Sequence, residues 1–162
     1  MKKLLLLLLL AAGVARGATN DNLALVGEAQ LDVFVWSVYR SRLFAPEGEY
    51  APQSRPLRLE ITYLHDISAE QLVRRTEKEW RHLGLKHPQQ DHWLESLRSL
   101  WPDVSQDDTL VLELNKGEQS HFYFNGHPIG RIDHPDFGAQ FLAIWLSPQT
   151  SQPALRRKLL GE

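Results

Sequence analysis

The stretch AQLDVFVWSVYRSRLF, residues 29–44, decides the fold class. One parity carries Leu31, Val33, Val35, Tyr39 and Leu43, and the other carries Asp32, Phe34, Trp36, Arg40 and Arg42. A period of two with β-branched and aromatic residues predicts a β-strand. Because this stretch is long for a single strand, we expect a bend or bulge near Ser37.

Strand periodicity returns at four later places. They are LRLEITY (57–63), TLVLELN (109–115), SHFYFN (120–125) and HPIGRI (127–132). Lys116-Gly117-Glu118 and Asn125-Gly126 predict turns before the last two. Pro128 predicts that the final strand lies at a sheet edge or begins late, because proline cannot donate to a strand ladder.

Helical periodicity separates these strands and follows them. Ser68 and Gln71 have capping-box spacing, and the apolar stripe after them ends near Gly84. Second, third and fourth helices are expected over 88–100, around 137–145, and from Ser151 through Leu160. The order of elements along the chain is a group of strands, two helices, a second group of strands and two further helices. This order predicts an α+β domain, with an antiparallel sheet and helices over one face.

Residues 1–17 have the pattern of a secretory signal peptide. Lys2-Lys3 precede seven leucines, and small residues follow near Ala15 and Gly17. The apolar run falls short of the roughly 20 residues that span a bilayer, so we expect cleavage near residues 15–18 rather than a stable membrane anchor. The expected result is a secreted, periplasmic protein with one domain over residues 20–161.

Composition excludes several classes of protein. The chain contains no cysteine, which excludes disulfides, thiolate metal sites and a cysteine nucleophile. Because Lys2, Lys3 and Arg16 lie in the expected leader, the mature chain has 15 basic residues against 20 acidic ones. Nucleic-acid surfaces are basic, so we expect no nucleic-acid partner.

Motifs for common chemistry are missing from the sequence. It contains no GxSxG, no GxxxxGK[ST], no GxGxxG and no HExxH. His82, His87 and His92 are spaced by five, which places them on different faces of a helix, although His121, His127 and His134 could converge. We therefore expect no metal ligands and no cofactor. Arg74-Arg75 are expected on a solvated helix face, where cations favour the helix dipole.

An aromatic and cationic grouping is the candidate binding site. Its members are Trp36, Tyr39, Arg42, Tyr63 and Tyr123, on strands expected to lie alongside one another. Aromatic rings line apolar pockets, an arginine holds a carboxylate through two hydrogen bonds, and a tyrosine hydroxyl adds another. The alternative is that these rings are ordinary core or sheet-face residues and that the arginines are exposed.

Four segments resemble the chalcone isomerase-like family, in particular its small exported bacterial branch. They are VGEAQLDVFVWSVYRSRLFAPEGEY (26–50), PLRLEITYLHDISAEQLVRRTEKEW (56–80), FYFNGHPIGRIDHPDFGAQFLAIWLSP (122–148) and TSQPALRRKLLG (150–161). The resemblance implies an open-faced β-sandwich, a large antiparallel sheet with helices packed on one face.

The catalytic residues of the family are not matched in this sequence. Plant chalcone isomerases close a ring with the help of an early arginine, but no arginine lies between Ala18 and Val33 here, and Phe34 aligns with a family threonine. Glu70 and Gln71 stand where a catalytic tyrosine is expected. Without a cation for the developing oxyanion, we expect no catalytic residues.

Noncatalytic relatives that bind fatty acids make a binding role the preferred hypothesis. The expected partner is a small apolar or amphipathic ligand, such as a carboxylic or fatty acid. An isomerase or lyase using Tyr39 or His65 for acid-base chemistry is the first alternative. A cell-envelope interaction module, with its pocket filled by its own side chains and a contiguous exposed apolar patch, is the second.

Overall fold

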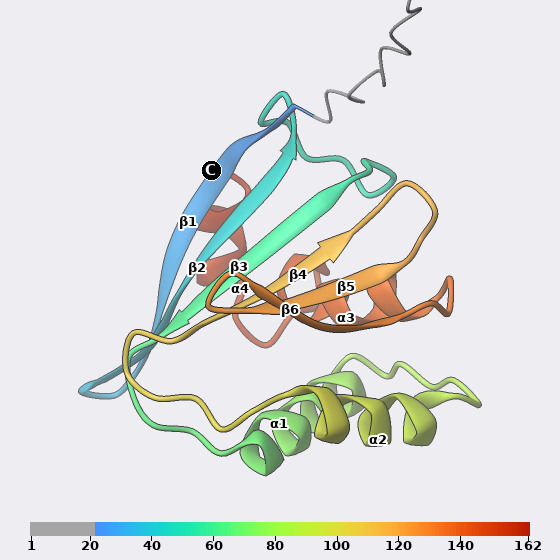
Figure 1. Ribbon diagram of the computed structural model, residues 1–162. Coiled ribbons are helices and arrows are strands. Elements are labelled where there is room, and N and C mark those ends of the chain that lie inside the picture. The colour runs from blue at the N-terminus through green and yellow to red at the C-terminus, as the bar shows by residue number, and fades with distance from the viewer. Residues whose placement is uncertain (1–21) are drawn as a thin grey trace, which may run out of the picture.

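The structure, a computed structural model, describes residues 22–162, so the leader predicted at residues 1–17 lies outside the described part. Six antiparallel strands form one open sheet in the order β1-β2-β3-β4-β5-β6, each beside its neighbour in sequence (Figure 1). The strands are β1 (Leu23–Val33), β2 (Trp36–Pro46), β3 (Leu57–Tyr63), β4 (Thr109–Leu114), β5 (Ser120–Phe124) and β6 (His127–Ile132). The predicted α+β class and antiparallel sheet are confirmed.

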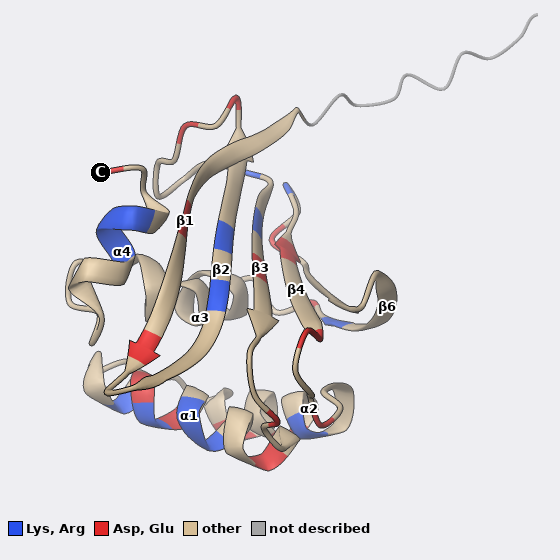
Figure 2. Ribbon diagram, turned by 90° about the vertical axis from the view of Figure 1, so that its left-hand side faces the viewer, with Lys and Arg blue, Asp and Glu red and all other residues tan. Residues whose placement is uncertain are grey.

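Four helices pack on one face of the sheet. They are α1 (Ala69–His82), α2 (Gln90–Leu100), α3 (Phe137–Leu146) and α4 (Pro153–Leu159). In Figure 2 α3 lies behind the strands, α4 lies beside β1, and the α1 and α2 pair lies at one end of the sheet. Contacts join α4 to β1, α1 to α3, and α2 to β6. No helix of the described residues is long and apolar enough to cross a membrane.

The strand β3 shows how the sequence separates a core face from an outer face. Leu57, Leu59, Ile61 and Tyr63 are buried beneath the helices, as a period of two requires. Arg58, Glu60 and Thr62 face outward, where Arg58 forms an ion pair with Glu113 at 2.8 Å on the neighbouring strand. Apolar burial beneath the helices therefore fixes the sheet register.

The capping box predicted at the start of α1 is present. The Gln71 amide nitrogen donates to Ser68 Oγ at 3.2 Å, and the Ser68 amide nitrogen donates to Gln71 Oε1 at 2.9 Å. Near the other end of the helix, the buried indole Nε1 of Trp80 donates to the Gln140 carbonyl at 3.0 Å. These contacts fix the position of α1 over the sheet.

The prediction of one bent strand over residues 29–44 is wrong. The chain reverses at Phe34 and Val35, with Val33 paired to Trp36, so the stretch forms the end of β1 and most of β2. Neither reversing residue is glycine, asparagine or aspartate, so the usual turn signal was missing. A register shift between Leu31 and Asp32 then pairs Leu31 with Tyr39 and leaves Val38 as an extra residue on β2.

The reversal itself gives a test of backbone strain. Phe34 adopts a φ of 55° while its side chain is 98% exposed, so it accepts a left-handed backbone without any compensating burial. We expect Phe34→Gly to raise the free energy of unfolding by about 0.5 kcal/mol, because glycine adopts positive φ readily. Chemical denaturation measures the change. Val35→Gly, at a neighbour with negative φ, should lower stability, and the reverse order would contradict this reading.

Candidate functional site

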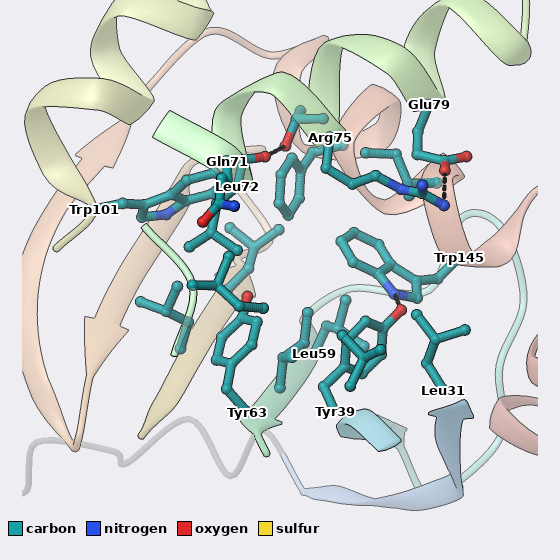
Figure 3. A pocket seen from close by; sticks show the side chains of 18 of the residues that line it. Leu31, Tyr39, Leu59, Tyr63, Gln71, Leu72, Arg75, Glu79, Trp101 and Trp145 are labelled. Carbon is teal, nitrogen blue, oxygen red and sulfur yellow. Dashed lines mark hydrogen bonds and ion pairs between the residues drawn. The ribbon is translucent and has the colours of Figure 1, made fainter. Parts of the chain in front are cut away.

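A cavity of about 260 Å³ lies between the inner face of the sheet and the helices (Figure 3). Its sheet wall includes Leu31, Tyr39, Leu59, Ile61, Tyr63, Leu110, Leu112 and Phe122. Its helix wall includes Leu72, Thr76, Phe141, Ile144 and Trp145. Most of these side chains are apolar, so the cavity suits a small molecule with a largely hydrocarbon body.

Two tyrosines form the polar part of the sheet wall. Tyr39 on β2 is the direct cross-strand partner of Tyr63 on β3, and their ring centroids are 6.3 Å apart in an edge-to-face arrangement. The extra residue Val38 gives Tyr39 the same facing as Leu31 and Tyr63. The β1–β2 irregularity therefore places Tyr39 in the cavity.

The two hydroxyl groups are only partly satisfied. Trp145 on α3 donates its indole Nε1–H to the Tyr39 hydroxyl oxygen at 2.9 Å, while the Tyr63 hydroxyl points into the cavity (Figure 3). Within residues 22–162, neither hydroxyl has an acceptor for its own proton. Each is a hydrogen-bond donor available to a ligand.

Burial keeps both tyrosines protonated. Loss of hydration raises the pKa of Tyr39 to about 12, although the hydrogen bond from Trp145 opposes the rise. Loss of hydration also raises the pKa of Tyr63, and the neighbouring Tyr39 adds to this rise. The hydroxyls therefore remain neutral donors throughout the ordinary pH range.

These raised pKa values predict a loss of stability in alkali. Below pH 10 both folded and unfolded Tyr39 are protonated, whereas between pH 10 and about 12 only the unfolded residue ionises. Stability is thus full below pH 10 and falls as the pH rises, by as much as about 3 kcal/mol for Tyr39 alone. Urea unfolding across this range measures the loss. Tyr39→Phe should show a smaller loss than the parent, and an equal loss in both proteins would contradict the assignment.

A partly buried ion pair lies at the helix side of the cavity. Arg75 Nη2 on α1 is 2.6 Å from Glu79 Oε1, and Ser151 Oγ donates to Glu79 Oε2 at 2.8 Å. The Glu79 side chain is 6% exposed and that of Arg75 is 52% exposed. The guanidinium therefore borders both cavity and solvent, with its charge matched by a buried carboxylate.

The expected solvated position holds for Arg74 and for the charged end of Arg75, which is also a cavity residue. Arg74 is mostly exposed and pairs with Glu70 at 3.0 Å. Arg75 precedes Thr76 on the edge of the buried stripe of α1, and its long side chain runs along the cavity while its charged end reaches water. A cation consequently borders the cavity although none occupies the family's arginine position.

The structure brings two of the five candidate site residues together. Tyr39 and Tyr63 line the cavity, whereas Trp36, Arg42 and Tyr123 do not. Trp36 is 62% exposed beside the β1–β2 turn, with its ring 5.5 Å from that of His65. Arg42 lies on the outer face of β2 and pairs with Glu60.

Strand parity explains the placements of Arg42 and Tyr123, and position along the strand explains that of Trp36. Arg42 alternates with the buried Leu43, and Tyr123 alternates with the buried Phe122, so each faces away from the helices. Trp36 begins β2 directly after the reversal, outside the covered part of the sheet. Whether Tyr39 and Tyr63 contact a ligand remains a prediction.

Among the cavity residues that were not candidates, Thr76, Arg75, Trp101 and Trp145 matter most for its chemistry. The helical stripe of Phe137, Phe141, Ile144 and Trp145 predicts a buried face but does not tell which member borders a void. Trp101 follows α2 and is also buried. The hydrogen bond from the Trp145 indole to Tyr39 would have identified Trp145 as a cavity residue. This bond depends on how the helix packs against the sheet, so no local sequence pattern predicts it.

Three residues outside the cavity could offer metal ligands. Ligand atoms of His87, His134 and Asp136 lie within 4.8 Å of one another, the one such group found in the described part of the chain. However, Nδ1 of His87 accepts from the Gln89 amide at 3.1 Å, and Nδ1 of His134 accepts from the Asp136 amide at 3.2 Å. These bonds place the proton of each neutral ring on Nε2, where a metal would otherwise bind.

Comparison with known proteins gives one family. A family model described as chalcone isomerase-like matches residues 15–161. An uncharacterized protein of Haemophilus influenzae is 27% identical over 137 residues, which are 85% of this chain and 67% of that protein. The crystal structure of an Arabidopsis thaliana fatty-acid binding protein matches with a TM-score of 0.69 and 12% identity, covering 86% of this chain and 87% of that chain. At this low identity, the structural likeness shows the fold alone.

Proposed function

The chain belongs to the chalcone isomerase-like family, and from this premise we propose that it is a noncatalytic protein that binds a small apolar or amphipathic ligand. The observation that carries the proposal is the cavity of about 260 Å³ between sheet and helices. Apolar walls supply binding energy in proportion to the area they bury, and the two tyrosine hydroxyls supply orientation. The fatty-acid binding of the Arabidopsis protein supports the same class of ligand.

The size of the cavity favours a short ligand. Its volume is slightly below the roughly 300 Å³ at the lower end of small-molecule pockets. We therefore propose a medium-length hydrocarbon chain with one polar end, such as a carboxylic or fatty acid or a related derivative. Eight-carbon compounds are suitable probes.

The chemistry of the cavity supports binding over catalysis. An acid or base works best when its pKa lies near the operating pH. Burial moves the pKa of Tyr39 away from neutrality, to about 12. His65, the other candidate for acid-base chemistry, does not line the cavity.

Two further features complete the proposal. The leader of residues 1–17 supports export to the periplasm, where a carrier would meet apolar molecules in an aqueous compartment. The consecutive exposed apolar residues from Val33 to Trp36 fit the alternative of an interaction module, but such a module would also fill its interior with its own side chains, and the cavity supports cargo instead. Fractionation of cells that express the full chain tests the location, which a cytoplasmic mature protein would contradict.

A fluorescence titration tests the binding function. The purified protein is titrated with N-phenylnaphthylamine, an apolar dye that brightens when it leaves water, and the dye is then displaced with eight-carbon compounds. We expect saturable binding at one site and competitive displacement. Binding that does not saturate, or dye that no eight-carbon compound displaces, would overturn the proposal.

A further inference from the structure

We infer that the polar end of the ligand is an uncharged hydrogen-bond acceptor, such as the carbonyl of an ester, ketone or quinone, and that Tyr39 and Tyr63 bind it. The inference rests on the proposed binding function and specifies the ligand class. It follows from an excess of donors in the cavity and from the absence of unbalanced positive charge among the described residues that line it.

Two hydroxyl groups of the sheet wall have protons with no acceptor among residues 22–162. The Tyr39 oxygen already accepts a hydrogen bond from Trp145, so its own proton must be directed elsewhere. The Tyr63 hydroxyl points into the same cavity, and its ring lies 6.3 Å from that of Tyr39. Two neighbouring donors match the two lone pairs of one carbonyl oxygen.

A third donor is buried in the cavity wall. The indole Nε1 of Trp101 is buried and has no hydrogen-bond partner among residues 22–162, although this tryptophan is one of the cavity residues. A buried donor without a partner is costly, so natural proteins seldom keep one. At the helix wall, Thr76 Oγ1 donates to the Leu72 carbonyl at 3.0 Å and Gln71 Oε1 accepts from Ser68. The tyrosine hydroxyls and the Trp101 indole together favour an acceptor on the ligand.

Charge distinguishes a neutral acceptor from a carboxylate. The titratable groups among the described lining residues are Tyr39, Tyr63, Arg75 and Glu79. Arg75 is already paired with Glu79 at 2.6 Å, so the two charges together sum to zero. A carboxylate placed beside them would lose its hydration and would meet the buried Glu79 carboxylate. An ester or ketone has neither cost.

Matched eight-carbon compounds test the head group. Methyl octanoate, octanoate and octylamine are compared as competitors of N-phenylnaphthylamine at pH 7.5. We expect methyl octanoate to bind at least tenfold more tightly than octanoate or octylamine. Octanoate binding as tightly as the ester would overturn this inference while leaving the binding function intact, whereas failure of all three compounds would overturn both.

Two substitutions locate the interaction. Tyr63→Phe removes one donor and should weaken methyl octanoate by a severalfold larger factor than it weakens the dye, which has no carbonyl. Glu79→Gln removes the balancing charge from Arg75 and should increase octanoate binding severalfold relative to methyl octanoate. Glu77→Gln, which alters an exposed carboxylate on the same helix paired with Arg81, is the control. Equal effects of Glu79→Gln and Glu77→Gln on octanoate, or no effect of Tyr63→Phe on the ester, would overturn the inference.

Discussion

Thr76→Trp is expected to abolish dye and ligand binding while the protein remains folded. Thr76 lies on α1 with its side chain buried against the cavity, and its hydroxyl bonds only to its own helix. An indole at this position would occupy the space that the ligand needs. We expect an affinity loss of at least tenfold, equivalent to about 1.4 kcal/mol, measured by dye titration.

The matched control is Lys78→Trp, which places the same side chain on the exposed face of α1. It should leave the dye affinity within twofold of the parent. Far-ultraviolet circular dichroism and thermal unfolding establish that both variants fold. Retained dye binding in folded Thr76→Trp would show that the dye binds outside this cavity.

Gly27→Ala is expected to produce the largest loss of stability. A Cβ atom at this position of β1 would lie 2.2 Å from the Lys158 carbonyl oxygen and 2.7 Å from the Leu159 carbonyl oxygen, both backbone atoms of α4. The helix would have to move away from the sheet to accommodate one methyl group. We expect the free energy of unfolding to fall by about 3 kcal/mol, measured by urea denaturation.

Gly117→Ala serves as the control for the general effect of replacing glycine. Its added Cβ would have one near neighbour, the Asn115 side-chain oxygen at 3.3 Å, in the turn between β4 and β5. Stability should change by less than about 0.5 kcal/mol. If Gly27→Ala is as mild as this control, the close contact between β1 and α4 is not a feature of the folded protein.

Periodicity predicted most of the fold because one face of the central strands β3 and β4 is buried. The alternation in LRLEITY assigns Leu57, Leu59, Ile61 and Tyr63 to the core face, and the structure buries all four. The reversal at Phe34 and Val35 could not be predicted in this way. The register irregularity on β2 keeps Tyr39 on the same face as Leu31, so the same alternation of inward-facing and outward-facing residues runs through both strands. A strand pattern alone does not distinguish one long strand from two that are antiparallel.

Strand parity predicted only those parts of the candidate site that lie on the strands. Tyr39 and Tyr63 have core-facing parity and line the cavity. Arg42 was chosen for its chemistry, although its parity opposes that of Tyr39 and places it on the outer face. Trp145 could not be found from a local pattern, because its bond to Tyr39 joins residues far apart in the sequence.

The position of the cation separates this chain from the catalytic members that it resembles. Arg75 comes from a helix rather than from the early strand region, and Glu79 balances its charge at 2.6 Å. A guanidinium already bound to a carboxylate is poorly suited to stabilise a developing oxyanion. This arrangement supports a binding protein that keeps its cavity electrically neutral.

Native mass spectrometry of the protein, purified without detergent from cells that express the full chain, tests the central claim most directly. Binding in the cavity predicts an added mass of one small apolar molecule that is released on activation and is missing from the Thr76→Trp variant. A ligand-free parent protein that also takes up no methyl octanoate or octanoate would contradict the account.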